Sequence, residues 1–292
     1  MKASSVLGML RAWSLPMSIS SVLLGGAMAL FVRFNIYTFL LAIIATLLLH
    51  AGTNVLNDAN DVSQGVDRPG CATALYREHP VLKGELTVNN AFMISAVTIS
   101  AGLLLGAYIS YITGPAVFLL ELIGAVMLAS YNGPLANLKA HGFGELDVSL
   151  VFGPPLVMGG FAAASGGIVS LSALLVSLLP TMIMMSIIYS NNYRDRVSDS
   201  EAGVRSFAMM TQKHGYKIYA SFLLAVYALQ AVFIIFGLLP LYSLLTLLTI
   251  PYSIKLLRMF RLNALDIDSK TGTLFAIYNI LLVAGLVMSM IF

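Results

Sequence analysis

Residues 36–56 read IYTFLLAIIATLLLHAGTNVL and contain no Asp, Glu, Lys or Arg. A helix of about 20 such residues crosses the ~30 Å hydrocarbon core of a bilayer. The whole chain shares this character, because 59% of its 292 residues are hydrophobic and 10% are charged. Soluble domains carry about 25% charged residues, so this composition excludes a water-soluble globular protein. Continuous apolar runs also disfavour a spanning β-barrel. We predict an all-α, polytopic membrane protein.

Hydropathy marks nine such segments. They lie at about 14–32, 36–56, 91–113, 115–130, 146–164, 169–190, 216–237, 238–254 and 273–291. We therefore predict nine transmembrane helices in a single domain covering residues 1–292. Two four-helix units, at about 14–131 and 146–254, would be followed by a ninth helix at 273–291. Pro154 and Pro155 lie inside the fifth segment and should kink it.

The basic residues give the orientation. With a cytoplasmic N-terminus, 15 of the 16 Lys and Arg residues fall in inside loops, and only Arg33 falls outside. Such an asymmetry is typical of integral membrane proteins, whose cytoplasmic loops are rich in Lys and Arg. Two inside connections, at about 57–90 and 191–215, are also much longer than the outside ones and contain most of the acidic residues. Long loops of this kind are usually functional or disordered, so we expect any active site on the cytoplasmic side of a cell membrane.

The first acidic cluster begins on the last turn of the second apolar segment, at residues 54–69, NVLNDANDVSQGVDRP. Its polar residues Asn54, Asn57, Asp58 and Asp61 are three or four apart, which places them on one helical face. Gly65 should end the helix and leave Asp67 and Arg68 in the loop.

The second cluster ends the sixth segment, at residues 191–205, NNYRDRVSDSEAGVR. Asn191 or Asn192, Asp195 and Asp199 again share a helical face. Carboxylates that converge from two helices repel each other unless a cation lies between them. Oxygen ligands without thiols or imidazoles suit Mg²⁺, which favours substrates with phosphate groups. The four histidines, at 50, 79, 141 and 214, show no metal-ligand spacing.

Basic side chains near the clusters could hold the remaining phosphate oxygens; they are Arg68, Lys83, Lys139, Arg194, Arg196 and Arg205. Together these residues predict a Mg²⁺–diphosphate site at the cytoplasmic membrane surface. For one cluster alone, a solvated acidic helix end is an equally good explanation. Two clusters on equivalent helices, each with asparagines one turn earlier, favour binding.

Two further residues leave their alternatives open. Glu121 lies inside the fourth segment, where a carboxylate marks either a function or a protonated, hydrogen-bonded group. Tyr131, at the end of that segment, is either an interfacial anchor or a ring whose face stabilises a cation.

These motifs resemble the UbiA superfamily of intramembrane prenyltransferases over essentially the full chain. Asn57-Asp58-Ala-Asn-Asp61 fits the first motif of that family, although Gly65 stands where many members have a third Asp, and Asp67 follows two residues later. The Gly-Val-Asp variant resembles the 1,4-dihydroxy-2-naphthoate prenyltransferase branch. Residues 11–16, RAWSLP, and 142–145, GFGE, are also similar to that branch. Lys139, Pro69 and His79-Pro80 instead resemble archaeal lipid-forming and 4-hydroxybenzoate members.

The resemblance implies helices around a central cavity and transfer of a polyprenyl group from its diphosphate to an acceptor. By position, Asp58, Asp61 and Asp67 would bind one Mg²⁺, and Asp195 and Asp199 a second. It leaves open whether Asp61 or Asp67 is the closer ligand. Supporting and diphosphate- or acceptor-binding roles would fall to Asn54, Asn57, Asn191, Asn192, Arg68, Lys139, Arg194, Arg205 and Arg11.

The implied partners are a polyprenyl diphosphate, a small aromatic or lipid acceptor and the bilayer, with no nucleic acid. The acceptor would be an aromatic quinone precursor, with menaquinone biosynthesis as the implied context. A different acceptor would make the chain an ether lipid synthase or a 4-hydroxybenzoate prenyltransferase, and the absence of an acceptor would make it a terpene cyclase. A cation-coupled transporter is a more distant alternative, because the acidic residues lie at membrane ends rather than at the midplane.

Overall fold

The computed structural model describes residues 8–70, 79–131, 136–201 and 203–292, and these ranges contain helices and no strand. The α-helices are α2 (Leu15–Ala29), α3 (Ile36–Ser63), α5 (Val88–Thr113), α6 (Ala116–Tyr131), α7 (Gly144–Phe152), α8 (Pro154–Ser165), α9 (Leu171–Val176), α10 (Leu178–Glu201), α11 (Phe207–Met210), α12 (Gly215–Ile235), α13 (Ile250–Arg261) and α14 (Ile267–Ile291). Three 3₁₀ helices join them: η1 (Leu138–His141), η2 (Gln212–His214) and η3 (Leu241–Thr249).

Each of the nine predicted apolar segments coincides with helical structure. In the described part of the chain, seven helical stretches are long and apolar enough to cross a membrane. The other two, α2 and α6, are apolar but shorter. The all-helical membrane fold is therefore confirmed, while nine crossings and a cytoplasmic N-terminus stay predictions. The predicted kink is confirmed, because the fifth segment breaks at Gly153 into α7 and α8, with Pro154 at the first position of α8.

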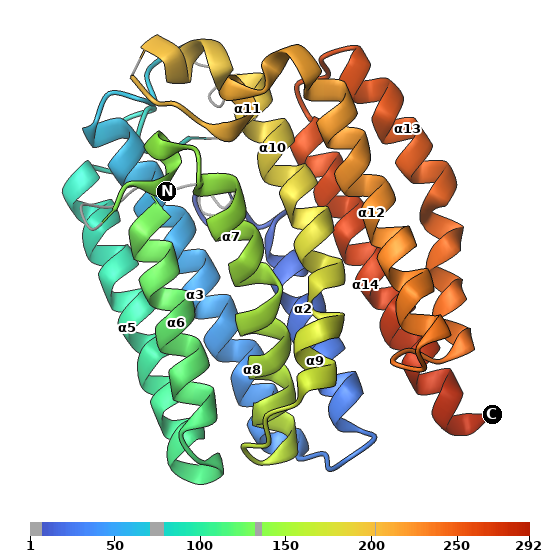
Figure 1. Cartoon of the computed structure of the whole chain (residues 1–292). Helices are drawn as coiled ribbons and strands as arrows, with labels where there is room; N and C mark the ends of the chain where they lie inside the picture. Colours follow the sequence, from blue (N-terminus) through green and yellow to red (C-terminus); the bar gives the residue numbers. More distant parts are fainter. Residues whose placement is uncertain (1–7, 71–78, 132–135, 202) are drawn as a thin grey trace.

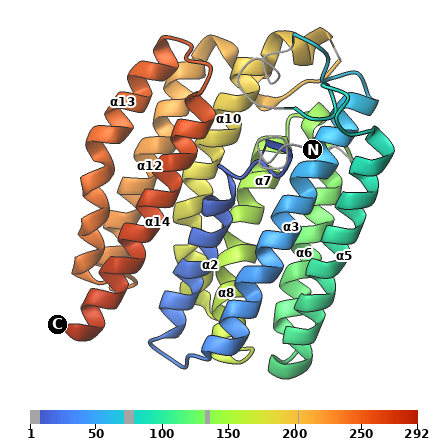
Figure 2. The same cartoon turned by 180° about the vertical axis from the view of Figure 1, so that it is seen from behind.

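The helices form one bundle (Figures 1 and 2). Helices α12, α13 and α14 lie on one side of it, and α3, α5 and α6 lie on the other. Between them, α2 packs on α8, and α10 packs on α7, α12 and α14. Chain end Phe292 lies at the end of the bundle opposite α11 (Figure 1). The long ends of α3 and α10 that carry the aspartates lie at the same end as α11.

Glycines let α2 and α8 cross closely. A Cβ on Gly25 would lie 1.9 Å from the Val157 carbonyl oxygen, and one on Gly160 would lie 2.5 Å from that of Val22. Contacts this short mean that the two backbones touch, as at small-residue crossings of membrane helices, where packing replaces the hydrophobic effect. This crossing fixes α2 beside the cavity described below.

The other side of the bundle is held together by uncharged polar contacts. Thr246 on η3 donates a hydrogen bond to Oε1 of Gln230 on α12 at 2.7 Å, and Tyr278 on α14 donates to the same atom at 2.6 Å. The Gln230 amide donates in turn to the Ser243 carbonyl at 2.7 Å. Because a buried polar group without a partner is costly in an apolar environment, this network specifies how the three elements pack.

Candidate functional site

A cavity of about 250 Å³ runs between α2, α3, α5, α6, α7, α8 and α10. Its deeper walls are mainly apolar and include Ala45, Leu49, Ile109, Leu120 and Val151. Its polar end is formed by the last turns of α3 and α10 and by the segment after α6. The polar residues at that end include most of the predicted site: Arg11, Asn54, Asn57, Asp61, Asp67, Tyr131, Lys139, Asn191, Asp195 and Asp199.

The two aspartate-bearing helices end in the same way. At the end of α3, Gly65 has φ +72°, and the Val66 amide donates to the Asp61 carbonyl at 2.8 Å. At the end of α10, Gly203 has φ +75°, and the Val204 amide donates to the Asp199 carbonyl at 2.9 Å. A left-handed glycine with this bond back to the last turn is a standard helix stop. Both helices therefore end on the turn that carries their last aspartate, as predicted for Gly65.

Lys139, from η1, lies among the carboxylates. Its Nζ is 3.6 Å from Oδ1 of Asp199, and its side chain is 12% exposed. Burial lowers the pKa of this amine, but the charges of Asp61, Asp199 and Asp195 outweigh burial and leave the pKa raised above its usual value. The structure thus places a firmly protonated amine where the carboxylates of α3 and α10 converge.

The carboxylate of Asp199 is incompletely satisfied. Its Oδ2 atom is buried and, among the described residues, accepts no hydrogen bond. Burial raises the pKa of Asp199 to about 6, against the opposing effect of Lys139. A buried oxygen without a donor is expensive, and a bound divalent cation would satisfy it. The donors at this end of the cavity are carboxylate and amide oxygens, which suit Mg²⁺, so the residues present fit such an ion.

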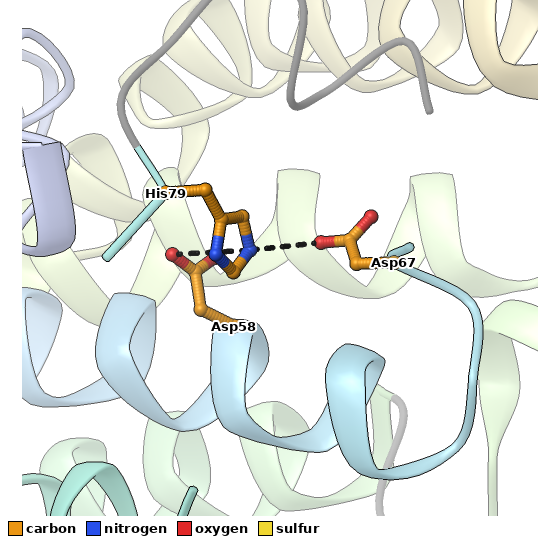
Figure 3. A group of neighbouring side chains, drawn as sticks. All are labelled: Asp58, Asp67 and His79. Atoms are coloured by element: carbon orange, nitrogen blue, oxygen red, sulfur yellow. Dashed lines mark hydrogen bonds and ion pairs between the residues drawn. The ribbon is translucent and has the colours of Figure 1, made fainter. Parts of the chain in front are cut away.

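Asp58 has a different environment from the other aspartates. It is buried and does not line the cavity, and its Oδ1 accepts from Arg11 Nη2 at 2.5 Å. Arg11 itself has φ +47°, an unfavourable conformation for a residue with a side chain. Figure 3 shows the imidazole of His79 between Asp58 and Asp67, with Nε2 at 3.9 Å and 3.2 Å from their carboxylates. One ligand atom from each of these three side chains lies within 4.8 Å of the others, so they could together hold a cation.

Arg194 organises the second cluster. Its guanidinium donates two hydrogen bonds to Asp195, each at 2.8 Å, and forms an ion pair with Asp268 of α14 at 2.9 Å. It also donates to the Asn191 side chain at 2.8 Å and to the Leu265 carbonyl at 3.0 Å. Only 5% of its side chain is exposed. Arg194 therefore fixes the orientation of Asp195 and does not line the cavity.

The remaining predicted residues lie in the structure as follows. Asn54 lines the cavity and donates from Nδ2 to the Leu10 carbonyl at 3.0 Å. Asn192 is fully buried, outside the cavity lining, and accepts from the Asn191 amide at 3.3 Å. Arg68 is exposed and paired with Glu201, so it links the ends of the two aspartate helices. Arg205 is exposed and lies outside the cavity lining.

Three residues at or near this site were not predicted as site residues from the sequence. His79 is 12 positions beyond Asp67 in the sequence and is brought to it only by folding. Asp268 starts the last helix and is recognisable only through its ion pair with Arg194. His50 lies within an apolar segment, and its place in the cavity wall follows from packing. No spacing rule links any of them to the aspartate motifs, so only knowledge of which distant residues meet could have found them.

Comparison with known proteins identifies related sequences and folds. The sequence profile described as the UbiA prenyltransferase family matches residues 18–287. The zebrafish UbiA prenyltransferase domain-containing protein 1 is 29% identical over 291 residues, which cover 96% of this chain and 83% of that protein. Its Drosophila melanogaster homologue is 28% identical over 267 residues, covering 89% of this chain and 72% of that protein.

Solved structures share the fold. An apo UbiA homologue from Aeropyrum pernix K1 superposes with a TM-score of 0.72 at 20% identity, covering 95% of this chain and 97% of that one. A UbiA homologue from Archaeoglobus fulgidus bound to GPP and Mg²⁺ gives 0.65 at 15% identity, covering 96% and 100%. A digeranylgeranylglyceryl phosphate synthase gives 0.61 at 16% identity, covering 97% and 96%. The chain belongs to the UbiA prenyltransferase family.

Proposed function

We propose that this membrane prenyltransferase transfers a polyprenyl group from its diphosphate to an aromatic quinone precursor, with 1,4-dihydroxy-2-naphthoate as the acceptor and menaquinone biosynthesis as its context. The observation that carries the proposal is the meeting of two aspartate helices at one end of an apolar cavity. Asp61 and Asp67 come from one, Asp195 and Asp199 from the other, and Lys139 lies with them. This end of the cavity would face the cytoplasm, as the distribution of Lys and Arg predicts.

Two sets of aspartates would hold Mg²⁺. Asp61 and Asp67, together with Asp58 and His79, form the first set, and Asp195 and Asp199 form the second. When bound, the ions neutralise charge on the diphosphate and favour its departure. The structures of homologues bound to GPP or DMAPP with Mg²⁺ support this choice of substrate and metal.

The chain's own residues account for the other requirements of the reaction. Lys139, a protonated donor at the polar end of the cavity, would donate to the diphosphate, where preorganised charge stabilises the leaving group. Arg194 holds Asp195 in place. The apolar walls below exclude water, which would otherwise capture the allylic cation left when the bond between C1 and the diphosphate oxygen breaks.

The acceptor closes the reaction. An electron-rich ring carbon forms a bond to C1 of the prenyl group, and the naphthoate loses its carboxylate as CO₂ from that carbon. The Gly65-Val66-Asp67 variant of the first motif supports the naphthoate branch.

A direct assay tests the proposal. Purified protein is incubated with Mg²⁺, labelled geranylgeranyl diphosphate and each of three acceptors: 1,4-dihydroxy-2-naphthoate, 4-hydroxybenzoate and geranylgeranylglyceryl phosphate. We expect prenylated naphthoquinol as the main product, and its loss in Asp61→Ala and Asp195→Ala proteins that still fold. Transfer to the glycerol phosphate lipid alone would refute the acceptor. Transfer to no acceptor, with Mg²⁺-dependent terpene formation, would indicate a cyclase.

A further inference from the structure

The imidazole of His50 lies in the wall of the cavity and has no role in the diphosphate chemistry proposed above. His50 is on α3, one turn before Asn54, so it lies about 6 Å below Asn54 along the helix axis. It lines the cavity together with Trp13, Met17 and Phe152. The Phe152 ring meets the imidazole edge-on, with centroids 5.2 Å apart. Flat and polarisable side chains therefore surround one titratable group, just below the polar end of the cavity.

Two serines of the α2 region contact the imidazole. Nδ1 of His50 is 2.9 Å from Ser18 Oγ, and Nε2 is 3.3 Å from Ser14 Oγ. Each serine hydroxyl carries one proton. That of Ser14 is donated to the Arg11 carbonyl at 2.8 Å, and that of Ser18 to the Leu15 carbonyl at 3.0 Å.

With the serine protons placed on these carbonyls, the contacts select one tautomer of His50. Since the Ser18 proton is used by a carbonyl, Ser18 Oγ accepts a hydrogen bond, and the imidazole donates it from Nδ1. Neutral imidazole has one N–H and one lone pair, so the lone pair lies on Nε2. Ser14 offers Nε2 no proton, because its own is donated to Arg11, and Ser14 Oγ also accepts from Asn54 Nδ2 at 3.2 Å. Nε2 is thus a base without a proton donor among the described residues that contact it.

We propose that His50 is the general base of the transfer, with Nε2 taking the hydroxyl proton of a phenolic acceptor held between Trp13, Met17 and Phe152. This inference rests on the proposed function. As the O–H bond breaks, its electron pair moves into the ring, and the ring carbon bonds to C1 of the prenyl group. The diphosphate leaves with the C1–O electron pair. The naphthoate carboxylate then departs as CO₂, and the electron pair of the broken C–C bond returns to the ring oxygen, which regains a proton to give the quinol.

The neighbouring groups can also accommodate the imidazolium that results. With a proton on both nitrogens, Nδ1–H donates to Ser18 Oγ and Nε2–H donates to Ser14 Oγ. Both contacts already exist in the structure, so His50 can accept a proton without rearrangement. The proton returns from Nε2 to the ring oxygen after CO₂ has left, so His50 is neutral again when the quinol departs. A base raises the rate of such a step by about 10²–10⁴-fold when it is positioned in this way.

The test separates diphosphate departure from transfer. We expect His50→Gln to bind prenyl diphosphate with the same KM as the unaltered protein and to transfer it about 100-fold more slowly. The loss should shrink for acceptors with more acidic hydroxyls, which need less help from a base. In His50→Ala, added imidazole should restore part of the transfer rate. Transfer by His50→Gln within threefold of the unaltered rate, or an equal loss for all acceptors without imidazole rescue, would overturn the assignment.

A second measurement does not depend on any variant. ¹⁵N NMR of histidine-labelled protein in detergent should show His50 as the neutral tautomer with its proton on Nδ1, the resonance being assigned by its disappearance in whichever His50 variant folds. A proton on Nε2 instead would overturn the inference. If the unaltered protein releases no diphosphate with Mg²⁺, the proposed function is wrong. The NMR measurement of the tautomer is independent of that result and tests the assignment of His50 by itself.

Discussion

Replacing Lys139 with Gln should have opposite effects on metal affinity and on catalysis. In the metal-free protein, the Lys139 amine is the cation that the carboxylates of α3 and α10 share. An arriving Mg²⁺ must take these oxygens from the amine and then remain beside its positive charge. Without the amine, the ion meets only carboxylates. We therefore expect Lys139→Gln to bind divalent ions more tightly in the absence of diphosphate and to transfer prenyl groups more slowly, because the donor to the leaving group is gone.

The size of the effect follows from the distance. Unit charges 3.6 Å apart, as in the pair of Lys139 Nζ and Asp199 Oδ1, attract by about 5 kcal/mol at an effective dielectric constant of about 20. Most of this attraction energy is regained when the amine moves to other partners as the ion binds. A neighbouring opposite charge typically shifts the pKa of a carboxyl group, and so its affinity for a proton, by about 1–3 units, and a divalent ion is subject to the same electrostatic effect. We expect an increase in metal affinity of about tenfold or more.

Titration with Mn²⁺, followed by electron paramagnetic resonance, measures the affinity directly, since Mn²⁺ prefers the same oxygen ligands as Mg²⁺. Lys270→Gln provides a matched control, because it removes the same charge from an exposed lysine paired with Asp266 and away from the cavity lining. Weaker Mn²⁺ binding in Lys139→Gln than in Lys270→Gln would overturn this expectation. It would mean that Lys139 supports the metal site rather than competing for it.

Three further perturbations have clear expected outcomes. Gly160→Ala places a Cβ 2.5 Å from a backbone oxygen of α2 and should lower the free energy of unfolding by about 1–3 kcal/mol, measured by thermal unfolding in detergent. The Cβ of Gly159→Ala meets no atom within 4 Å, so this control variant should be as stable as the unaltered protein. Arg194→Met should lower the free energy of unfolding by about 3–5 kcal/mol in the same assay, because it leaves buried carboxylates without their ion-pair partner. In a double-mutant cycle, adding Asp268→Asn should recover part of that loss. Because burial raises the pKa of Asp199 to about 6, protons compete with the metal ion below that pH. Mn²⁺ affinity should therefore rise about tenfold per pH unit as the pH increases toward 6 and level off above it. Asp199→Asn should abolish this pH dependence.

Local patterns in the sequence predicted the parts of the site that depend on one helix at a time. The three- and four-residue spacing of Asn54, Asn57 and Asp61 placed them on one face, and all three line the cavity. Gly65 marked the end of α3 because only a left-handed residue fits that turn. The apolar segments predicted the helices because hydropathy, like helical spacing, is a property of residues that are close together in the sequence.

Contacts between distant segments could not be predicted in this way. Asp58 is one residue further around the helix than Asn57, and this rotation is enough to turn it to Arg11 and His79. Arg194 was expected to contact diphosphate or acceptor; in the structure it is held by Asp195 and by Asp268, which is 74 positions away along the chain. Such pairs are decided by how helices pack, and single-helix periodicity contains no information about that.

We expect the aspartates of α3 and α10 to act as one Mg²⁺-dependent diphosphate site. The test is the binding of geranyl thiolodiphosphate, an analogue whose C1–S bond does not readily break to give the allylic cation, measured by calorimetry with and without Mg²⁺. We predict binding that requires Mg²⁺ and that is lost equally in Asp61→Asn and Asp195→Asn, while both variants still unfold cooperatively in detergent. Tight binding without Mg²⁺, or full binding by either folded variant, would show that the two sets of aspartates do not form one Mg²⁺-dependent site.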